Sequence, residues 1–266
     1  MPRQKLGQHF LIRGSILERI AAAACPTRQD LVIEIGPGRG ALTEKLLRRA
    51  ARVVAIEVDP RLVERLRLKF AAEPRLEIVC ADVLEADLAR WGPATIAGNL
   101  PYYIASPILE KVLLLNPPRA VFLIQKEVAE RLVARPGDRE YGYLTVRTAL
   151  FADARLLFEV KPAAFHPPPK VDSAVVLLEP PARDPGLPGR DAFLRFLAQC
   201  FRQKRKTLRN NLAGIYGKEV VGAWPEASLR AEQISLEGFA AMFRRLGDCP
   251  LPPLIAVRQV ERQRPP

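Results

Sequence analysis

The chain has 266 residues, and 48% of them are hydrophobic, which is enough for one full core and a small second domain. Lys and Arg number 41 against 29 acidic residues, so the net charge is +12 and a polyanion is the expected large partner. Four dispersed cysteines without a C-x-x-C pair, two histidines and no long apolar run argue against a disulfide framework, a metal site and a membrane span, and favour a cytoplasmic protein.

Short β-branched runs alternate with segments of helical period along the first two thirds of the chain. The runs are LVIEI (31–35), RVVAIE (52–57), LEIVC (76–80), TIAG (95–98) and AVFLIQ (120–125). Leucine spacing predicts a helix over 41–50, and Asp59 with Pro60 supplies the N-cap and first turn of another over 61–70. This alternation predicts an α/β fold with a doubly wound parallel sheet. Two later runs, 154–160 and 173–179, have no strong helix between them and are expected to close the sheet as an antiparallel pair.

A polar segment rich in proline and glycine, residues 179–191, has the composition of a linker. It predicts a first domain over residues 1–180 and a second over 181–266. The second part carries a net charge of +7, more than half of the total. Apolar residues at helical spacing predict helices over 191–217 and 235–247, so the second domain is expected to be small, basic and helical.

The first predicted strand runs into a glycine-rich stretch, EIGPGRGAL. Gly36, Gly38 and Gly40 predict a tight turn that brings backbone N–H groups against a ligand, although a purely structural turn is the alternative. The spacing departs from the dinucleotide fingerprint, in which the third glycine follows the second by three positions. Glu57, about 20 residues further on at the tip of the second strand, suits a ribose hydroxyl acceptor. Together these residues predict a site for an adenosine-type ligand, whereas Asp59 is expected to be the helix cap.

Two more polar residues follow later strands. Asp82 could accept a hydrogen bond from an adenine amine or simply close a turn. After the fourth strand, NLPYYI offers the Asn99 side-chain oxygen and a backbone carbonyl of the Leu100–Pro101 turn as acceptors for an exocyclic amine. Such an amine is a poor nucleophile because its lone pair is delocalised, and acceptors that hold its N–H groups favour a localised lone pair in the transition state. Tyr102 could then stack on a flipped base, whereas the competing interpretation is a structural proline turn with a packed tyrosine.

A run of cations occupies the predicted helical domain, and no acidic residue occurs over residues 195–218. A solvated helix face would mix in acids, so contact with phosphates is favoured. Such charge gives affinity without a choice of sequence. The run contains Arg202, Lys204, Arg205, Lys206 and Arg209.

Nine stretches, spread over nearly the whole chain, together resemble a known family. They are KLGQHFL, EIGPGRGALT, VVAIE, ADVL, NLPYYI, LIQKEVAERLVA, YGYLTV, FHPPPKVDSAVV and QKRKTLRNNL. They look like the rRNA adenine N6-dimethyltransferases, specifically the bacterial enzymes for small-subunit (16S) rRNA. The resemblance implies a Rossmann-like methyltransferase sheet, S-adenosylmethionine (SAM) as cosubstrate, and dimethylation of adenine N6 in the rRNA of immature ribosomal subunits during ribosome biogenesis.

The resemblance also implies roles for single residues. The target adenine would contact Asn99, Pro101 and Tyr102, with Phe165 as the second wall of its pocket. On the separate ground of the charge run, Lys204, Arg205, Lys206 and Arg209 of the second domain are expected to bind RNA. Together with Gly38 of the glycine-rich turn, the donor would be contacted by His9, Leu11, Gly36, Glu57, Asp82 and Asn99.

Two alternatives remain open. A related enzyme that methylates large-subunit rRNA and confers macrolide resistance would share the donor motifs and the Asn-x-Pro-Tyr turn, although QKRKTLRNNL favours the small-subunit enzyme. Alternatively, the chain acts chiefly as an assembly factor that binds immature subunits, with methylation secondary. No long exposed heptad pattern is present, so a monomer is expected.

Overall fold

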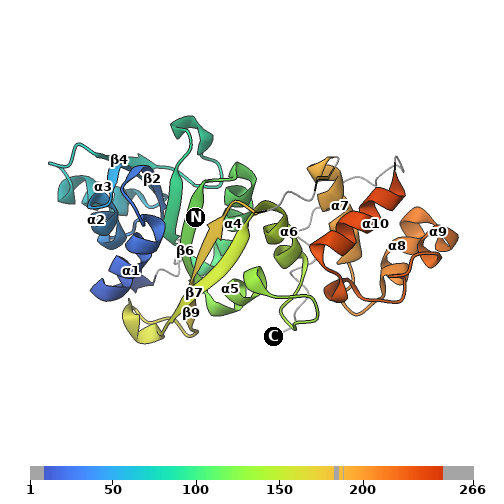
Figure 1. The fold of residues 1–266 in the computed structure, drawn as a ribbon. Coiled ribbons are helices and arrows are strands. Elements are labelled where there is room, and N and C mark those ends of the chain that lie inside the picture. Colours follow the sequence, from blue (N-terminus) through green and yellow to red (C-terminus); the bar gives the residue numbers. More distant parts are fainter. Residues whose placement is uncertain (1–8, 183–185, 188, 248–266) are drawn as a thin grey trace, which may run out of the picture. The chain divides into compact units, whose positions relative to one another are not determined.

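The computed structural model describes residues 9–182, 186–187 and 189–247. The chain divides into two units, which can be followed by colour in Figure 1. The sheet unit comprises the residues up to Val133 together with Phe151–Pro180. The helical unit comprises Ala134–Leu150 and the residues after Pro180.

The sheet unit is built on a seven-stranded sheet of order β4-β3-β2-β5-β6-β9-β7. The first five strands in this order are parallel, and β9 pairs antiparallel with both β6 and β7. Each predicted run lies within an observed strand, so the doubly wound sheet with a closing antiparallel pair is confirmed. The strands are β2 (Gln29–Ile35), β3 (Ala50–Glu57), β4 (Leu76–Cys80), β5 (Thr95–Asn99), β6 (Arg119–Gln125), β7 (Asp153–Val160) and β9 (Ser173–Glu179).

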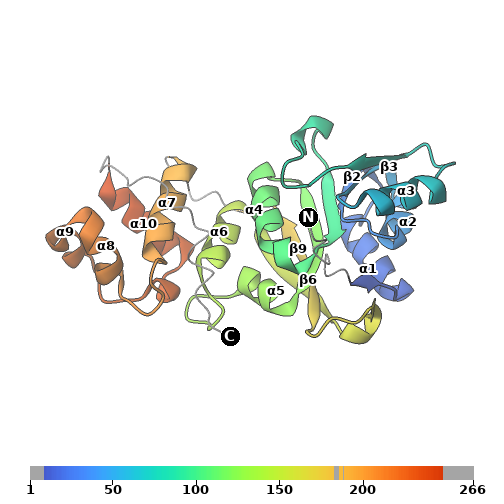
Figure 2. The same cartoon turned by 180° about the vertical axis from the view of Figure 1, so that it is seen from behind.

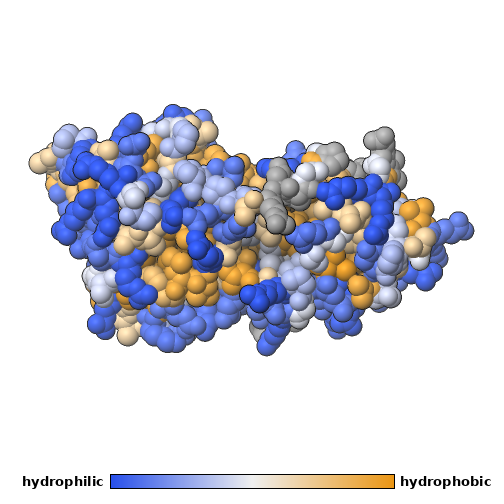
Figure 3. All heavy atoms as spheres, in the orientation of Figure 1, coloured by the Kyte–Doolittle hydropathy of each residue, from blue (hydrophilic) through white to orange (hydrophobic). Residues whose placement is uncertain are grey.

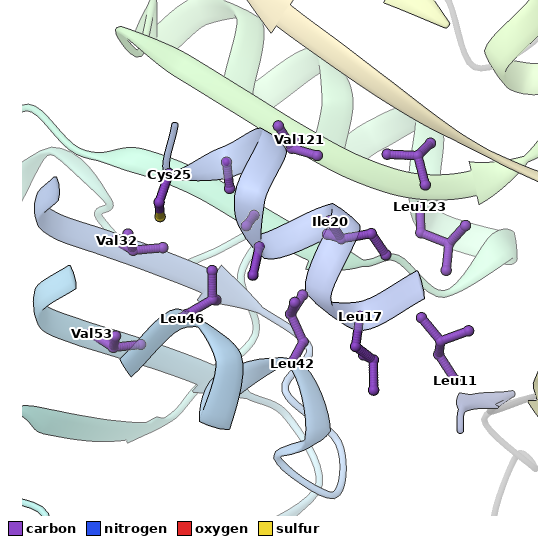
Figure 4. Packing of buried hydrophobic residues seen from close by; sticks show 14 of the residues in the cluster. Leu11, Leu17, Ile20, Cys25, Val32, Leu42, Leu46, Val53, Val121 and Leu123 are labelled. Atoms are coloured by element: carbon purple, nitrogen blue, oxygen red, sulfur yellow. The ribbon is translucent and has the colours of Figure 1, made fainter. Parts of the chain in front are cut away.

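Helices cover both faces of this sheet. On one face, Ile20 of α1 and Leu46 of α2 belong to a buried cluster with Val32 and Leu123 of the strands (Figure 4). The next residue along β2, Ile33, points to the opposite face and is also buried. Burial on both faces is what parallel strands require. The helices are α1 (Gly14–Ala24), α2 (Ala41–Leu47), α3 (Pro60–Lys69), α4 (Ala105–Leu115) and α5 (Lys126–Val133), with short 3-10 turns η1 (Ala89–Trp91) and η2 (Tyr102–Ile104).

A second, two-stranded sheet ties the N-terminal segment to the end of the sheet unit. β1 (Phe10–Leu11) pairs antiparallel with β8 (Phe165–His166), with Leu11 opposite Phe165. The 3-10 turn η3 (Pro162–Ala164) precedes β8, and Ile12 N donates to Ala164 O at 2.9 Å. The pairing fixes residues 9–12 against the loop that joins β7 to β9, a contact that the sequence patterns did not predict.

The helical unit has a core of aromatic side chains. Phe193, Phe196 and Phe239 are fully buried, and Phe193 meets Phe243 edge-on with ring centroids 5.4 Å apart. Figure 2 shows this group of helices from behind. Its elements are α6 (Tyr143–Phe151, whose last residue belongs to the sheet unit), α7 (Arg190–Cys200), α8 (Leu208–Tyr216), α9 (Lys218–Gly222), the 3-10 turn η4 (Ala231–Gln233) and α10 (Leu236–Leu246).

The helical unit is discontinuous in sequence, which differs from the predicted split at residue 180. One division does fall after Pro180, but residues 134–150 group with the later helices. Tyr141 Oη donates to Ile234 O at 2.6 Å, and Gly137 N donates to Glu232 O at 2.8 Å. These bonds join segments more than ninety positions apart, so linker composition alone could not reveal them.

The predicted helix over 191–217 is wrong, because two helices, α7 and α8, are separated there by a turn over residues 201–207. The Thr207 hydroxyl caps the start of α8. Asn211 Nδ2 donates to Cys200 O, at the end of α7, at 2.8 Å. These polar side chains compete with helix continuation, so most of the basic run lies in a turn and only Arg209 lies in a helix.

Hydrophilic residues cover most of the surface drawn in Figure 3, and hydrophobic residues gather in the sheet unit near β6, β7 and β9. Within the described ranges, no helix is long and apolar enough to cross a membrane. Three exposed hydrophobic side chains, Ile12, Val58 and Tyr103, border the cavity described next.

Candidate active site

A cavity of about 290 Å³ opens at the carboxyl ends of β2, β3 and β5. It is lined by residues 9–12, 36–39, 57–58, 81–83 and 99–104, together with side chains of β2, α1, α2 and α4. The chain order along the sheet reverses between β2 and β5, and doubly wound sheets bind ligands at such a reversal. The structure therefore gathers here the predicted residues His9, Leu11, Gly36, Gly38, Glu57, Asp82, Asn99, Pro101 and Tyr102.

The glycine-rich turn has a conformation that requires glycine. Gly36, Gly38 and Gly40 have φ of 68°, 58° and 77°, in the left-handed region. A Cβ on Gly40 would lie 2.6 Å from the Phe70 ring, and a Cβ on Gly38 would lie 3.0 Å from the Phe10 ring. The turn is thus packed closely against the Phe10 and Phe70 rings, and Gly36 and Gly38 line the cavity.

Glu57 ends β3 with its carboxylate held by backbone N–H groups. The carboxylate accepts from the N–H groups of Gly38 (3.1 Å), Val58 (3.0 Å) and Asp59 (3.1 Å). Burial raises the pKa of Glu57, and these three bonds oppose that rise. Asp59 is not part of the cavity wall; its side chain accepts from Arg61 N at 3.0 Å and caps α3, as predicted.

Glu34 is a cavity residue that the sequence patterns missed. Its side chain is only 1% exposed and accepts from Thr43 Oγ1 of α2 at 2.6 Å. Burial raises the pKa of Glu34 to about 8, the Thr43 hydrogen bond lowers it, and the nearby Glu57 carboxylate adds to the rise. An acid inside a buried strand, two positions before Gly36, was the available signal. A carboxyl group poised in this way can balance the positive charge of a ligand.

Asn99 is oriented by the N-terminal segment. Its Nδ2 donates to His9 O at 3.0 Å, which fixes the rotation of the amide. None of the described residues donates to Asn99 Oδ1, so this oxygen is available as an acceptor at the cavity wall. The backbone beside it is held by the sheet, because Leu100 N donates to Leu123 O at 3.0 Å.

His9 also supports Tyr102, through its ring. The two rings stack with centroids 5.7 Å apart and an angle of 29°. His9 Nδ1 lies 2.8 Å from Pro167 O, and Tyr102 Oη lies 2.6 Å from Ser173 Oγ. Burial raises the pKa of Tyr102. The N-terminal segment thus positions both candidate catalytic side chains. The backbone carbonyl of His9 holds Asn99, and the His9 ring supports Tyr102.

Two predicted positions differ in how they meet the cavity. Asp82 lines it, and its Oδ1 also accepts from Leu84 N at 2.8 Å, so it closes a turn as well. Phe165, predicted as a wall of the adenine pocket, is not among the cavity residues. It is 3% exposed and belongs to the same buried cluster as Leu11. A stacking role for Phe165 would require its ring to leave the core.

The predicted RNA-binding cations lie in the helical unit and are exposed. Lys204, Arg205 and Lys206 lie in the turn after α7, and Arg209 lies in the first turn of α8. Lys204 Nζ donates to Arg139 O at 3.0 Å. In the part of the chain that the structure describes, no cluster of three His, Cys, Asp or Glu side chains could hold a metal ion.

The chain is similar to known proteins over almost its full length. The protein-family model described as ribosomal RNA adenine dimethylase matches residues 2–246. A curated protein of Acidobacterium capsulatum, named ribosomal RNA small subunit methyltransferase A, is 42% identical over 92% of either chain. A protein of the same name from Pseudomonas aeruginosa is 39% identical over 93% of this chain and 96% of its own.

Two solved structures share the fold of both units. A dimethyladenosine transferase from Plasmodium falciparum matches with a TM-score of 0.76 and 29% identity, over 90% of this chain and 97% of its own. The 23S rRNA methyltransferase ErmE matches with a TM-score of 0.69 and 31% identity, over 89% of this chain and 99% of its own.

Proposed function

The chain belongs to the ribosomal RNA adenine dimethylase family, and from this premise we propose that it transfers methyl groups from SAM to the N6 amines of adenines in small-subunit rRNA. The observation that carries the proposal is the fixed amide of Asn99 beside Tyr102 at the cavity wall. The proposal extends to immature small subunits as substrate, in the cytoplasm, with the protein acting as a monomer that needs no metal.

The cavity residues suit SAM as the donor. SAM would supply an electrophilic methyl group on a positively charged sulfur. Glu57 offers a buried carboxylate to ribose hydroxyls, and Asp82 offers an exposed carboxylate to the adenine amine. Glu34 lies on β2, between the tips of β3 and β5, where its carboxyl group can balance positive charge. The backbone of the glycine-rich turn allows close approach, because no Cβ stands in the way.

The chemistry needs positioning more than proton abstraction. Asn99 Oδ1 and a carbonyl of the turn that follows would accept the two N–H groups of the target amine. The amine nitrogen held in this way would take the methyl group that SAM supplies, with S-adenosylhomocysteine as the leaving group, and would lose a proton to solvent. Tyr102, braced by His9 and Ser173, would stack on the flipped base. A second round on the same nitrogen gives the dimethylated base.

The test is methyl transfer to RNA with defined products. The protein is incubated with labelled SAM and immature small subunits, and the RNA is digested to nucleosides. Label in dimethyladenosine is expected, and Asn99→Ala should slow its appearance strongly while leaving subunit binding intact. Label confined to another nucleoside would overturn the proposal. Full biological function of Asn99→Ala would instead favour a factor that acts chiefly by binding.

The likeness to ErmE supports one competing substrate, large-subunit rRNA. Protein-free large-subunit RNA is therefore included in parallel reactions. Methylation of that RNA, with none of small-subunit particles, would reverse the assignment. The relatives from Acidobacterium capsulatum and Pseudomonas aeruginosa support the small-subunit choice, because both are named for it.

A further inference from the structure

Two loops of the helical unit, far apart in sequence, lie against each other. Loop A is residues 134–142, before α6, and loop B is residues 201–207, between α7 and α8. Lys204 Nζ of loop B donates to Arg139 O of loop A at 3.0 Å, across 65 positions of sequence. The basic run of loop B is thus joined to a second loop, which carries two arginines, Arg135 and Arg139, beside two acids, Asp138 and Glu140.

An aromatic cluster joins the ends of the two loops, where they meet the helices. Phe201, at the start of loop B, has its ring centroid 6.4 Å from that of Tyr141 and 6.4 Å from that of Tyr143. The Phe239 ring of α10 lies 5.5 Å from Phe201 on the core side. Tyr141 is 4% exposed, and its hydroxyl donates to Ile234 O at 2.6 Å. Both loops are therefore anchored by the same aromatic cluster in the core of the helical unit.

Each loop is also held by hydrogen bonds of its own. In loop A, Arg135 N donates to Asp138 Oδ2 at 2.7 Å. In loop B, Lys206 N donates to Gln203 O at 3.0 Å, and Asn211 Nδ2 donates to the same carbonyl at 3.2 Å. Loops bonded in this way present their charged side chains from fixed backbone positions, which lowers the entropy lost on binding.

The charges on this surface are mostly available to an outside partner. The Arg139 side chain is 94% exposed, and its ion pair with the adjacent Glu140 is loose, at 3.7 Å. Arg202, Arg205 and Lys206 are exposed, and none forms an ion pair with another described residue. Exposed cations on a fixed scaffold suit a repeating anion, and the phosphate backbone of a nucleic acid is one.

We infer that loops A and B form one RNA-docking surface, on which Arg139 contacts a backbone phosphate alongside Arg205 and Lys206. The inference rests on the proposed function, because it takes rRNA as the partner. Lys204 contributes to both the loop contact and the RNA contact. One of its ammonium N–H groups donates to the Arg139 carbonyl of loop A, and the other two remain available for the RNA. The surface carries affinity and leaves the choice of adenine to the cavity.

The experiment measures RNA affinity over a salt series for Arg139→Gln in the full chain. If Arg139 contacts one phosphate, the magnitude of the log–log slope should fall by roughly 0.7–0.9, and SAM affinity should not change. Lys218→Gln is the matched control, because Lys218 is an exposed cation of the same unit outside both loops. It should leave the slope as in the unaltered protein.

A double-mutant cycle tests whether the loops act together. Because Lys204 holds the Arg139 backbone, Lys204→Gln combined with Arg139→Gln should lose less affinity than the sum of the single changes. Lys218→Gln combined with Arg139→Gln should be additive. Additive losses for Lys204 and Arg139 would show two separate contacts and overturn the joint surface.

The outcomes also separate this inference from the proposed function. An unchanged slope in Arg139→Gln, in a protein that still binds and methylates small-subunit RNA, would overturn the docking surface alone. If the unaltered protein neither bound nor methylated that RNA, the proposed function would fall, and the docking surface with it.

Discussion

The cavity of the sheet unit and the basic surface of the helical unit are built from opposite electrostatics. In the cavity, Glu34 and Glu57 are 1% and 4% exposed, so a charge on either carboxyl group would interact with a ligand in a medium of low polarity. On the surface, Arg139 is 94% exposed, and water and salt screen its charge. The donor should therefore be bound by a few strong, specific groups and the RNA by many weak ones. Each of the following variants should disturb one region and leave the other intact.

The largest effect is expected from Asn99→Ala, which removes an acceptor that acts on the reacting amine. By comparison with the removal of one oxyanion-hole donor, the rate of methyl transfer should fall roughly 10²- to 10³-fold. The measurement is a single-turnover rate at saturating donor, with calorimetry as the check that donor still binds. The salt dependence of RNA affinity should not change. A rate close to that of the unaltered protein would remove Asn99 from the mechanism.

Glu57→Ala should have the next largest effect, and on donor affinity. Loss of a hydrogen bond to a charged acceptor costs about 1.5–3 kcal/mol, which is on the order of a tenfold to hundredfold loss of SAM affinity. Asp59→Ala should change SAM affinity less and instead cost about 1 kcal/mol of stability, because it removes the cap of α3. Calorimetric titration and thermal unfolding of both variants decide the matter. A greater affinity loss at Asp59 than at Glu57 would identify Asp59 as the donor ligand.

Replacing the four cations Lys204, Arg205, Lys206 and Arg209 together by neutral residues should lower only the affinity for RNA. Each lost phosphate contact should remove roughly 0.7–0.9 from the magnitude of the salt slope, with SAM affinity unchanged. Tyr102→Ala should do the reverse, keeping the slope and slowing turnover, because stacking worth about 1–3 kcal/mol releases no counterions. RNA affinity across a salt series, measured for both variants, checks the contrast. An unchanged slope in the neutralised protein would falsify the phosphate contacts.

The smallest effect concerns pH and Glu34. Its pKa is raised from 4.5 to about 8, so the folded protein without ligand holds a proton that the unfolded chain releases between these values. This group therefore makes the protein less stable as pH rises through that window. A positively charged donor favours the ionised form, so binding should release a proton, and SAM affinity should rise with pH towards 8 by at most about tenfold per unit.

Calorimetry in two buffers of different ionisation enthalpy measures the proton released on SAM binding. Glu34→Gln should bind SAM without this release and with a flatter pH dependence. Glu57 is the competing titrating group, because its pKa is also raised. The same proton release in Glu34→Gln as in the unaltered protein would show that Glu34 is not the group that titrates.

The strands could be predicted because their signal is local. Runs such as 52–57 and 173–179 are apolar and β-branched over a few residues, and all the predicted runs lie in strands. The insertion of β9 between β6 and β7 has no local signal. The pairing of β1 with β8 has none either, since each strand has two residues and they lie more than 150 positions apart.

The site was predictable where residues follow strand ends, and less so elsewhere. Gly36 directly follows a parallel strand, and Glu57 and Asn99 are the last residues of two others. The carboxyl ends of these strands meet at one edge of the sheet, where the cavity lies. Glu34 was missed because the run 31–35 was interpreted only as a strand, although an acid within such an apolar run is itself unusual. The environment of Phe165 depends on its pairing with Leu11, and no local sequence pattern predicts that pairing.

The two-part origin of the helical unit has a consequence for anyone who wishes to recombine these proteins. A chain cut after Pro180 would keep residues 134–150 and lose their partners, leaving Tyr141 without the Ile234 carbonyl and without the Phe201 ring. An apolar surface of this kind favours aggregation. A chimera that takes its helical unit from one relative and its sheet unit from another must therefore exchange two stretches at once, with junctions near 133, 151 and 180.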